Sequence, residues 1–217
     1  MRGRQNLSRI QSTNSRRASV LFSAALLVAW SLPVPATRAE APAAAISKAA
    51  AERCDKKLKA LQDFAEALSS SRKQTTRFTE DEVNSYLALE LSPEFHPCLK
   101  SLQMTFEERN LRGVASIDFD KLGTTSTKFM PRLLSKVFSG THRLDARGSL
   151  LSRNGKANFR LDQARFDNTK LPKSLVEEII TAVGKRQNPP FDPLQPSKLP
   201  YRIEEVDVHQ GYITVYQ

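Results

Sequence analysis

Apolar residues recur every three or four positions in three stretches of the chain, which is the spacing of one face of an α-helix. These stretches cover residues 49–70, 79–90 and 171–185. Thr79 and Glu82 fit a capping box at the start of the second stretch, and Pro172 suits the first turn of the third. The pattern predicts three amphipathic helices, each with one face packed against the rest of the chain.

Elsewhere apolar and polar residues alternate, which is typical of strands with one buried face. The alternation covers residues 102–106, 115–119, 142–150, 157–166 and 201–216. Asn154-Gly155 is the strongest hairpin signal in the chain, and turns are also expected at Arg109-Asn110 and Gln210-Gly211. We therefore predict an α+β protein: an antiparallel, curved sheet of about six or seven strands built from hairpins, packed with three or four helices. The fourth helix would lie within residues 123–140.

The first 39 residues have the order of a secretory signal: an arginine-rich start, an apolar run at residues 20–30, then small residues after Pro33 and Pro35. The run is shorter than the roughly 20 residues of a membrane-spanning helix. The sequence thus predicts export to the periplasm or the cell exterior, with an N-terminal membrane anchor as the alternative. Residues 40–51 would form an alanine-rich tether. Residues 52–217 would form one domain, with a helical part at 52–92 and a sheet-rich part at 99–217.

The net charge of the predicted domain is small. The chain has 33 basic and 23 acidic residues, a net charge of +10, but six of the basic residues are arginines of residues 1–39. The remaining 27 basic residues exceed the acidic ones by only four, so we expect no nucleic-acid partner. Basic residues are densest around the Asn154-Gly155 hairpin. Arg143, Arg147, Lys156 and Arg160 are candidates for contact with anionic head groups, and an ordinary solvated sheet face is the alternative.

The sequence holds few signs of catalysis. Cys54 and Cys98 would form one disulfide in an oxidising compartment, or remain two buried thiols. His96 lies beside Cys98, but no local signature of a cysteine enzyme surrounds them. The sequence has no HExxH metalloprotease motif, no GxSxG nucleophile elbow and no phosphate-binding glycine loop. We therefore expect no catalytic residues, no metal and no cofactor. A hydrolase with unrecognised residues stays an alternative.

Three motifs occur in one order: residues 79–87 (TEDEVNSYL), Gly148-Ser149-Leu150 with Asn154-Gly155, and Leu171-Pro172 followed by Leu199-Pro200 and the closing hairpin. Over residues 76–217 this order resembles the exported bacterial LmeA-like and YpmS-like proteins, which look like distant tubular lipid-binding domains. The resemblance implies a sheet wrapped against helices, an apolar groove for acyl chains, and no catalytic residues.

We therefore expect a non-enzymatic envelope protein that binds a lipid or another apolar ligand, with a membrane surface as a further partner. The candidate groove residues are Phe129, Leu133, Val137, Phe138, Leu175, Ile179 and Val183. The alternative is a protein-interaction or scaffold module of the periplasm or cell surface. Such a module would use the helix at 49–70 or the proline-rich loop at 189–200. The sequence makes no prediction of oligomeric state.

Overall fold

A computed structural model of the chain describes residues 46–67, 73–122, 139–167 and 169–217, which form four α-helices and nine strands. The helices are α2 (Lys48–Glu66), α3 (Glu80–Tyr86), α4 (Phe119–Leu122) and α5 (Lys173–Arg186). The strands are β1 (Thr75–Thr79), β2 (Leu99–Glu107), β3 (Asn110–Asp118), β4 (Thr141–Arg153), β5 (Lys156–Phe166), β6 (Thr169–Lys170), β7 (Ser197–Lys198), β8 (Glu205–His209) and β9 (Tyr212–Tyr216). A π-helical turn (Leu87–Leu91) and a 3-10 turn (Ser92–Glu94) follow α3. The α+β prediction is confirmed.

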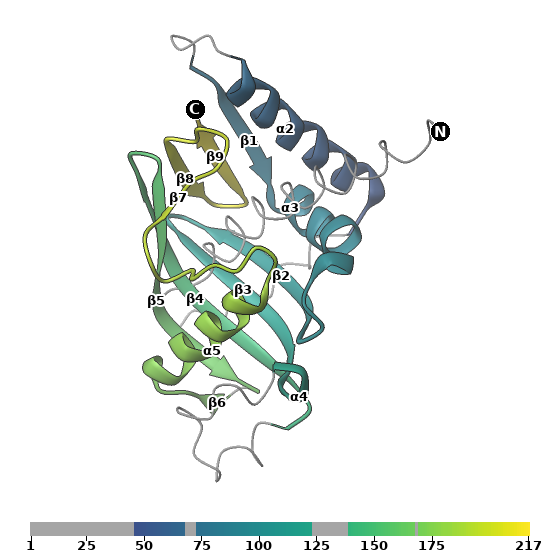
Figure 1. The fold of residues 1–217 in the computed structure, drawn as a ribbon, viewed down its shortest axis with the longest axis vertical. Coiled ribbons are helices and arrows are strands. Elements are labelled where there is room, and N and C mark those ends of the chain that lie inside the picture. Colours follow the sequence, from purple (N-terminus) through teal and green to yellow (C-terminus); the bar gives the residue numbers. More distant parts are fainter. Residues whose placement is uncertain (1–45, 68–72, 123–138, 168) are drawn as a thin grey trace, which may run out of the picture.

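The larger sheet has six antiparallel strands, ordered β2-β3-β4-β5-β6, with β7 also paired to β5 (Figure 1). The predicted Asn-Gly turn joins β4 to β5, and Asn154 and Gly155 have φ of 53° and 71°. Both angles lie in the left-handed region that such a hairpin turn needs. At 13 and 11 residues, β4 and β5 extend past β2 and β3, which have nine each.

The smaller sheet is ordered β1-β9-β8, so the predicted C-terminal hairpin pairs with β1 from the helical part of the chain. The sequence did not predict β1, because Phe78 is its one apolar residue and no alternation is visible. The predicted strand around residues 115–119 also ends early, since Phe119 begins α4.

One core joins both sheets and the helices, with buried side chains from Cys54 to Val215. In the larger sheet, alternate residues such as Leu144, Ala146 and Leu161 are buried, and α5 packs on this inner face. A close approach explains Gly184 in α5: a Cβ there would stand 2.7 Å from the carbonyl oxygen of Phe191. The turn of chain after α5 is thereby held against the helix.

Helix α3 covers the outer edge of β2. The buried amide of Asn84 donates to the carbonyl of Met104 and accepts from its N–H, both at 2.7 Å. One turn earlier, the Glu80 carboxylate accepts from the N–H of Phe106 at 2.8 Å. Polar groups of an edge strand that would otherwise be open to another chain are therefore satisfied within the domain.

Candidate functional site

The predicted groove residues are only partly described. Ile179 and Val183 are buried on α5 against the larger sheet, and Leu175 is half-buried. These side chains fill core. The other four candidates, Phe129, Leu133, Val137 and Phe138, lie outside the described residues, as does the helix expected there.

The outward side of β3, β4 and β5 is basic. Strand register places seven cations on this side, which we call the basic face: Arg112, Arg143, Arg147, Arg153, Lys156, Arg160 and Arg165. It includes all four residues predicted to meet anionic head groups. Arg112 could not be grouped with them by sequence, because it belongs to a different hairpin and joins β4 only through pairing.

Acidic residues neutralise the middle of the basic face. Asp145 accepts two hydrogen bonds from Arg112, at 3.0 and 2.6 Å. Partial burial opposes ionisation of Asp145, but the Arg112 guanidinium outweighs it and keeps the pKa of this carboxyl below its ordinary value. Longer contacts of 3.9 Å join Arg147 to Glu107 and Arg160 to Asp162.

The other four cations of the basic face make no ion pair with any described residue: Arg143, Arg153, Lys156 and Arg165. Register adds Lys170 to this side, opposite Arg165, and Lys198, opposite Lys156, together with Asp118 at the end of β3. Cations therefore outnumber carboxylates on this side of the larger sheet.

The basic face and the α5 residues lie on opposite sides of the sheet. Along β4, Arg143, Asp145 and Arg147 alternate with buried Leu144 and Ala146, which face the core with α5. A single small ligand therefore cannot touch both sets through the sheet.

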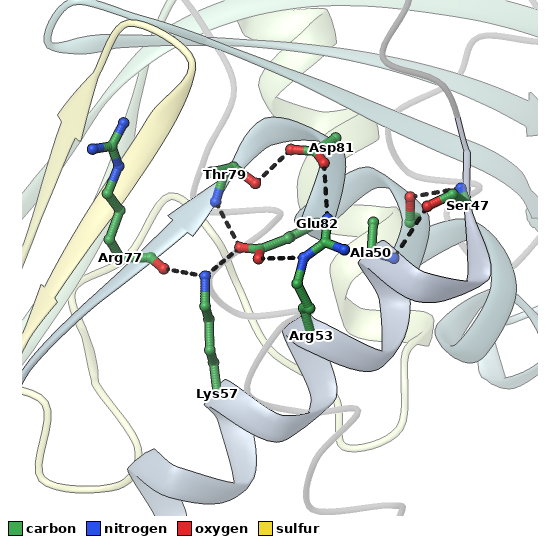
Figure 2. A network of polar contacts seen from close by, with 9 residues as sticks. Ser47, Ala50, Arg53, Lys57, Arg77, Thr79, Asp81 and Glu82 are labelled. Atoms are coloured by element: carbon green, nitrogen blue, oxygen red, sulfur yellow. Dashed lines mark hydrogen bonds and ion pairs between the residues drawn. The ribbon is translucent and has the colours of Figure 1, made fainter.

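A second group of cations lies where α2 meets α3, and there each cation has an acidic partner (Figure 2). The carboxylate of Glu82 accepts from Lys57 Nζ at 2.6 Å, from Arg53 Nε at 3.2 Å and from the Thr79 N–H at 3.0 Å. The last bond belongs to the predicted capping box, which is confirmed. Burial disfavours the charged form of Glu82, yet these donors keep its pKa below the ordinary value. This cluster is structural.

The predicted disulfide between Cys54 and Cys98 is wrong: both thiols are free and fully buried. Their surroundings differ, because Cys54 on α2 lies in the field of Glu82 and Cys98 before β2 lies in that of Arg186. Burial raises the pKa of both thiols. Each sulfur fills its own part of the core, which was the alternative reading of the sequence.

Cys98 and His96 are not arranged as a nucleophile and its base. The ring Nδ1 of His96 accepts from the backbone N–H of Cys98 at 3.2 Å. A reactive cysteine needs a lowered pKa and access to solvent, and the Cys98 thiol has the opposite of both. This geometry favours a structural role for the pair.

His142 is a polar site that the sequence did not reveal. Its Nδ1 lies 2.5 Å from the carboxylate of Asp167, and its Nε2 lies 2.8 Å from the carbonyl oxygen of Ser139. Since both partners are acceptors, only the imidazolium satisfies them together. The bond to Asp167 is the main reason that the pKa of His142 is raised. The ring stacks on Phe166 and clamps β4 to the end of β5.

The two segments considered for partner binding are both packed internally. Helix α2 buries its apolar face against α3 and β1. In the proline-rich loop, the carbonyl of Pro193 accepts from the N–H of Phe159, and β7 pairs with β5. Each segment therefore has a role within the fold.

Two further properties concern membranes and metals. No helix in the described ranges has the length and apolar character needed to span a membrane. Nor do the described residues bring three His, Cys, Asp or Glu side chains together as a metal ion would need.

No protein-family model matches the chain, and no curated protein matches it. The resemblance to the LmeA-like and YpmS-like proteins thus stays a prediction from the motifs.

Proposed function

We propose that this chain is an exported, non-enzymatic envelope protein that binds a lipid carrying negative charge, or another anionic amphiphile. One observation carries the proposal: cations outnumber carboxylates on the outward side of the larger sheet, and four of these cations make no ion pair with any described residue. Such a surface raises the local concentration of anionic partners. The signal-like N-terminus supports a location where envelope lipids are the available ligands.

The placement of the candidate residues shapes the proposal. Because the described groove residues fill core, the basic face, rather than a groove beneath α5, is the surface that meets the ligand.

The test is to express the full chain in a bacterial host with an envelope and to fractionate the cells. Native mass spectrometry and lipid extraction would follow on the protein recovered from the envelope fraction. The proposal expects a chain cleaved near Ala39 that carries an anionic lipid or takes one up from added lipid. An uncleaved, cytoplasmic, lipid-free chain that ignores added anionic lipid would contradict it.

A lipid-free protein that is nevertheless exported and recovered with another envelope protein would favour the interaction module instead. Both segments suggested for that role make internal contacts, so the described geometry gives it less support.

A further inference from the structure

The end of the β4–β5 hairpin holds a row of like charges. Arg153 on β4 is paired in register with Lys156 on β5, and Lys156 is paired with Lys198 on β7. Like charges directly opposite one another on neighbouring strands are destabilising. Three cations in one row therefore disfavour the folded state unless an anion lies beside them.

A hollow of about 590 Å³ opens at the same place. Arg153 and Lys198 line it together with Arg202, and so do the acidic residues Glu204 and Glu205. None of these three cations makes an ion pair with any described residue, despite the two nearby carboxylates. The hollow thus holds three cations and two carboxylates, and none of the cations is used in an ion pair with the described residues.

The walls of the hollow are held in place. The N–H of Gly155 donates to the carbonyl of Glu204 at 2.9 Å, and the carbonyl of Gly155 accepts from Leu199 at 2.8 Å. Arg202 follows Tyr201 in a turn where φ is 52° and 56°, angles that non-glycine residues rarely adopt. The buried amide of Gln217 donates to the carbonyl of Tyr201 and anchors this turn. Arg202 is therefore presented by a fixed, unfavourable backbone rather than by a loose loop.

An apolar side chain stands next to these cations. Leu151 is two residues before Arg153 on the same side of β4 and is 44% exposed. An exposed apolar residue beside several cations suits the boundary of an anionic bilayer, where the cations meet phosphates and the apolar group enters the layer below.

We propose that the end of the β4–β5 hairpin docks on an anionic lipid surface. Arg153, Lys156, Lys198 and Arg202 contact the phosphates of the head groups, and Leu151 enters the acyl region. The inference rests on the proposed function, from which it takes the lipid, and it adds the part of the molecule that meets the membrane.

The test is co-sedimentation of the exported full-length protein with phosphatidylcholine vesicles, with and without phosphatidylglycerol. Binding is expected only with phosphatidylglycerol. At about one kcal/mol for each basic residue near an anionic surface, the double variant Arg153→Gln/Lys198→Gln should bind roughly thirtyfold more weakly. The matched control is Lys56→Gln/Lys59→Gln on the exposed side of α2, which removes the same charge elsewhere and should change binding less than twofold.

A second pair of variants tests the apolar contact. Leu151→Ser should weaken vesicle binding by roughly fivefold to tenfold. Leu89→Ser is the control, because Leu89 is 43% exposed but lies beside Glu90, and it should have no effect. All four residues of the charge variants and both leucines are surface side chains, and thermal unfolding would verify that each variant is folded.

Equal binding to neutral vesicles, or equal losses in the controls and the hairpin variants, would overturn the docking site. If the protein still carries a co-purified anionic lipid in that case, the proposed function stands and only the docking site fails. If it binds neither vesicles nor added lipid, both fail.

Discussion

Cations cluster both at the junction of α2 and α3 and at the end of the β4–β5 hairpin. They are ion-paired at the junction but not at the hairpin end. At the junction, Lys57 and Arg53 bond to Glu82, which is 4% exposed and also closes a capping box. At the hairpin end, Arg153, Lys156 and Lys198 stand in one row without ion pairs to the described residues. The paired cations stabilise the fold, whereas the cations of the row repel one another.

The largest effect on stability is expected from the other side of α3, which holds the edge of β2. Asn84→Ala removes both hydrogen bonds to Met104 and leaves buried backbone groups unpaired next to a small cavity. We expect a loss of about 3 kcal/mol in the free energy of unfolding, measured by urea titration. A loss below about 0.5 kcal/mol would mean that α3 does not secure this edge.

A somewhat smaller loss is expected for Glu82→Ala, which removes the carboxylate that three donors share. Because Lys57 and Arg53 can turn toward solvent, we expect about 2 kcal/mol. Glu52→Ala on the exposed side of α2 is the control and should stay within about 0.5 kcal/mol. If the two variants lose the same amount of stability, Glu82 does not stabilise the junction of α2 and α3, and the contrast with the hairpin end is wrong.

At the hairpin end, removing a charged side chain should not lower the free energy of unfolding. Lys198→Ala takes one charge out of the row and relieves repulsion with Lys156. We expect stability to be unchanged or higher by about 0.2–0.5 kcal/mol at low salt, with the gain vanishing at high salt. A clear destabilisation in the same urea titration would show that the row is bonded within the fold.

The smallest effect concerns His142, whose pKa is raised chiefly by its hydrogen bond to Asp167. A raised folded-state pKa contributes stability that is fully present below the ordinary histidine value of about 6.5. That contribution is lost as pH rises through the folded-state pKa. Unfolding at pH 6 and at pH 8.5 should therefore show a loss at the higher pH that His142→Gln abolishes. An unchanged pH dependence in the variant would show that protonated His142 does not hold β4 to the end of β5.

The sequence predicted those parts of the fold that depend on neighbouring residues. The α5 helix, the capping box at Thr79 and the Asn154-Gly155 turn follow from local spacing and turn chemistry. The sequence did not predict pairing between distant segments. Strand β1 pairs with β9 across more than a hundred residues, and Phe78 is the one apolar residue of β1. The pairing of two particular cysteines likewise depends on positions in space.

The candidate site shows the same division. Dense basic residues around the hairpin were visible in the sequence, and they do share one side of the sheet. Lys198 was not visible, since it is 42 residues from Lys156 in a proline-rich loop and is placed opposite it only by the pairing of β7 with β5. Arg112 joined the basic face through the register of β3 for the same reason.

The most direct test of the account compares the two exposed leucines on a membrane. An environment-sensitive fluorophore would be attached to Leu151→Cys or, separately, to Leu89→Cys; Cys54 and Cys98 are fully buried and should not react. On adding vesicles that contain phosphatidylglycerol, we expect a blue shift and a gain in intensity for the label at position 151 and no change at position 89. Equal responses at both positions, or a response at position 89 alone, would contradict it.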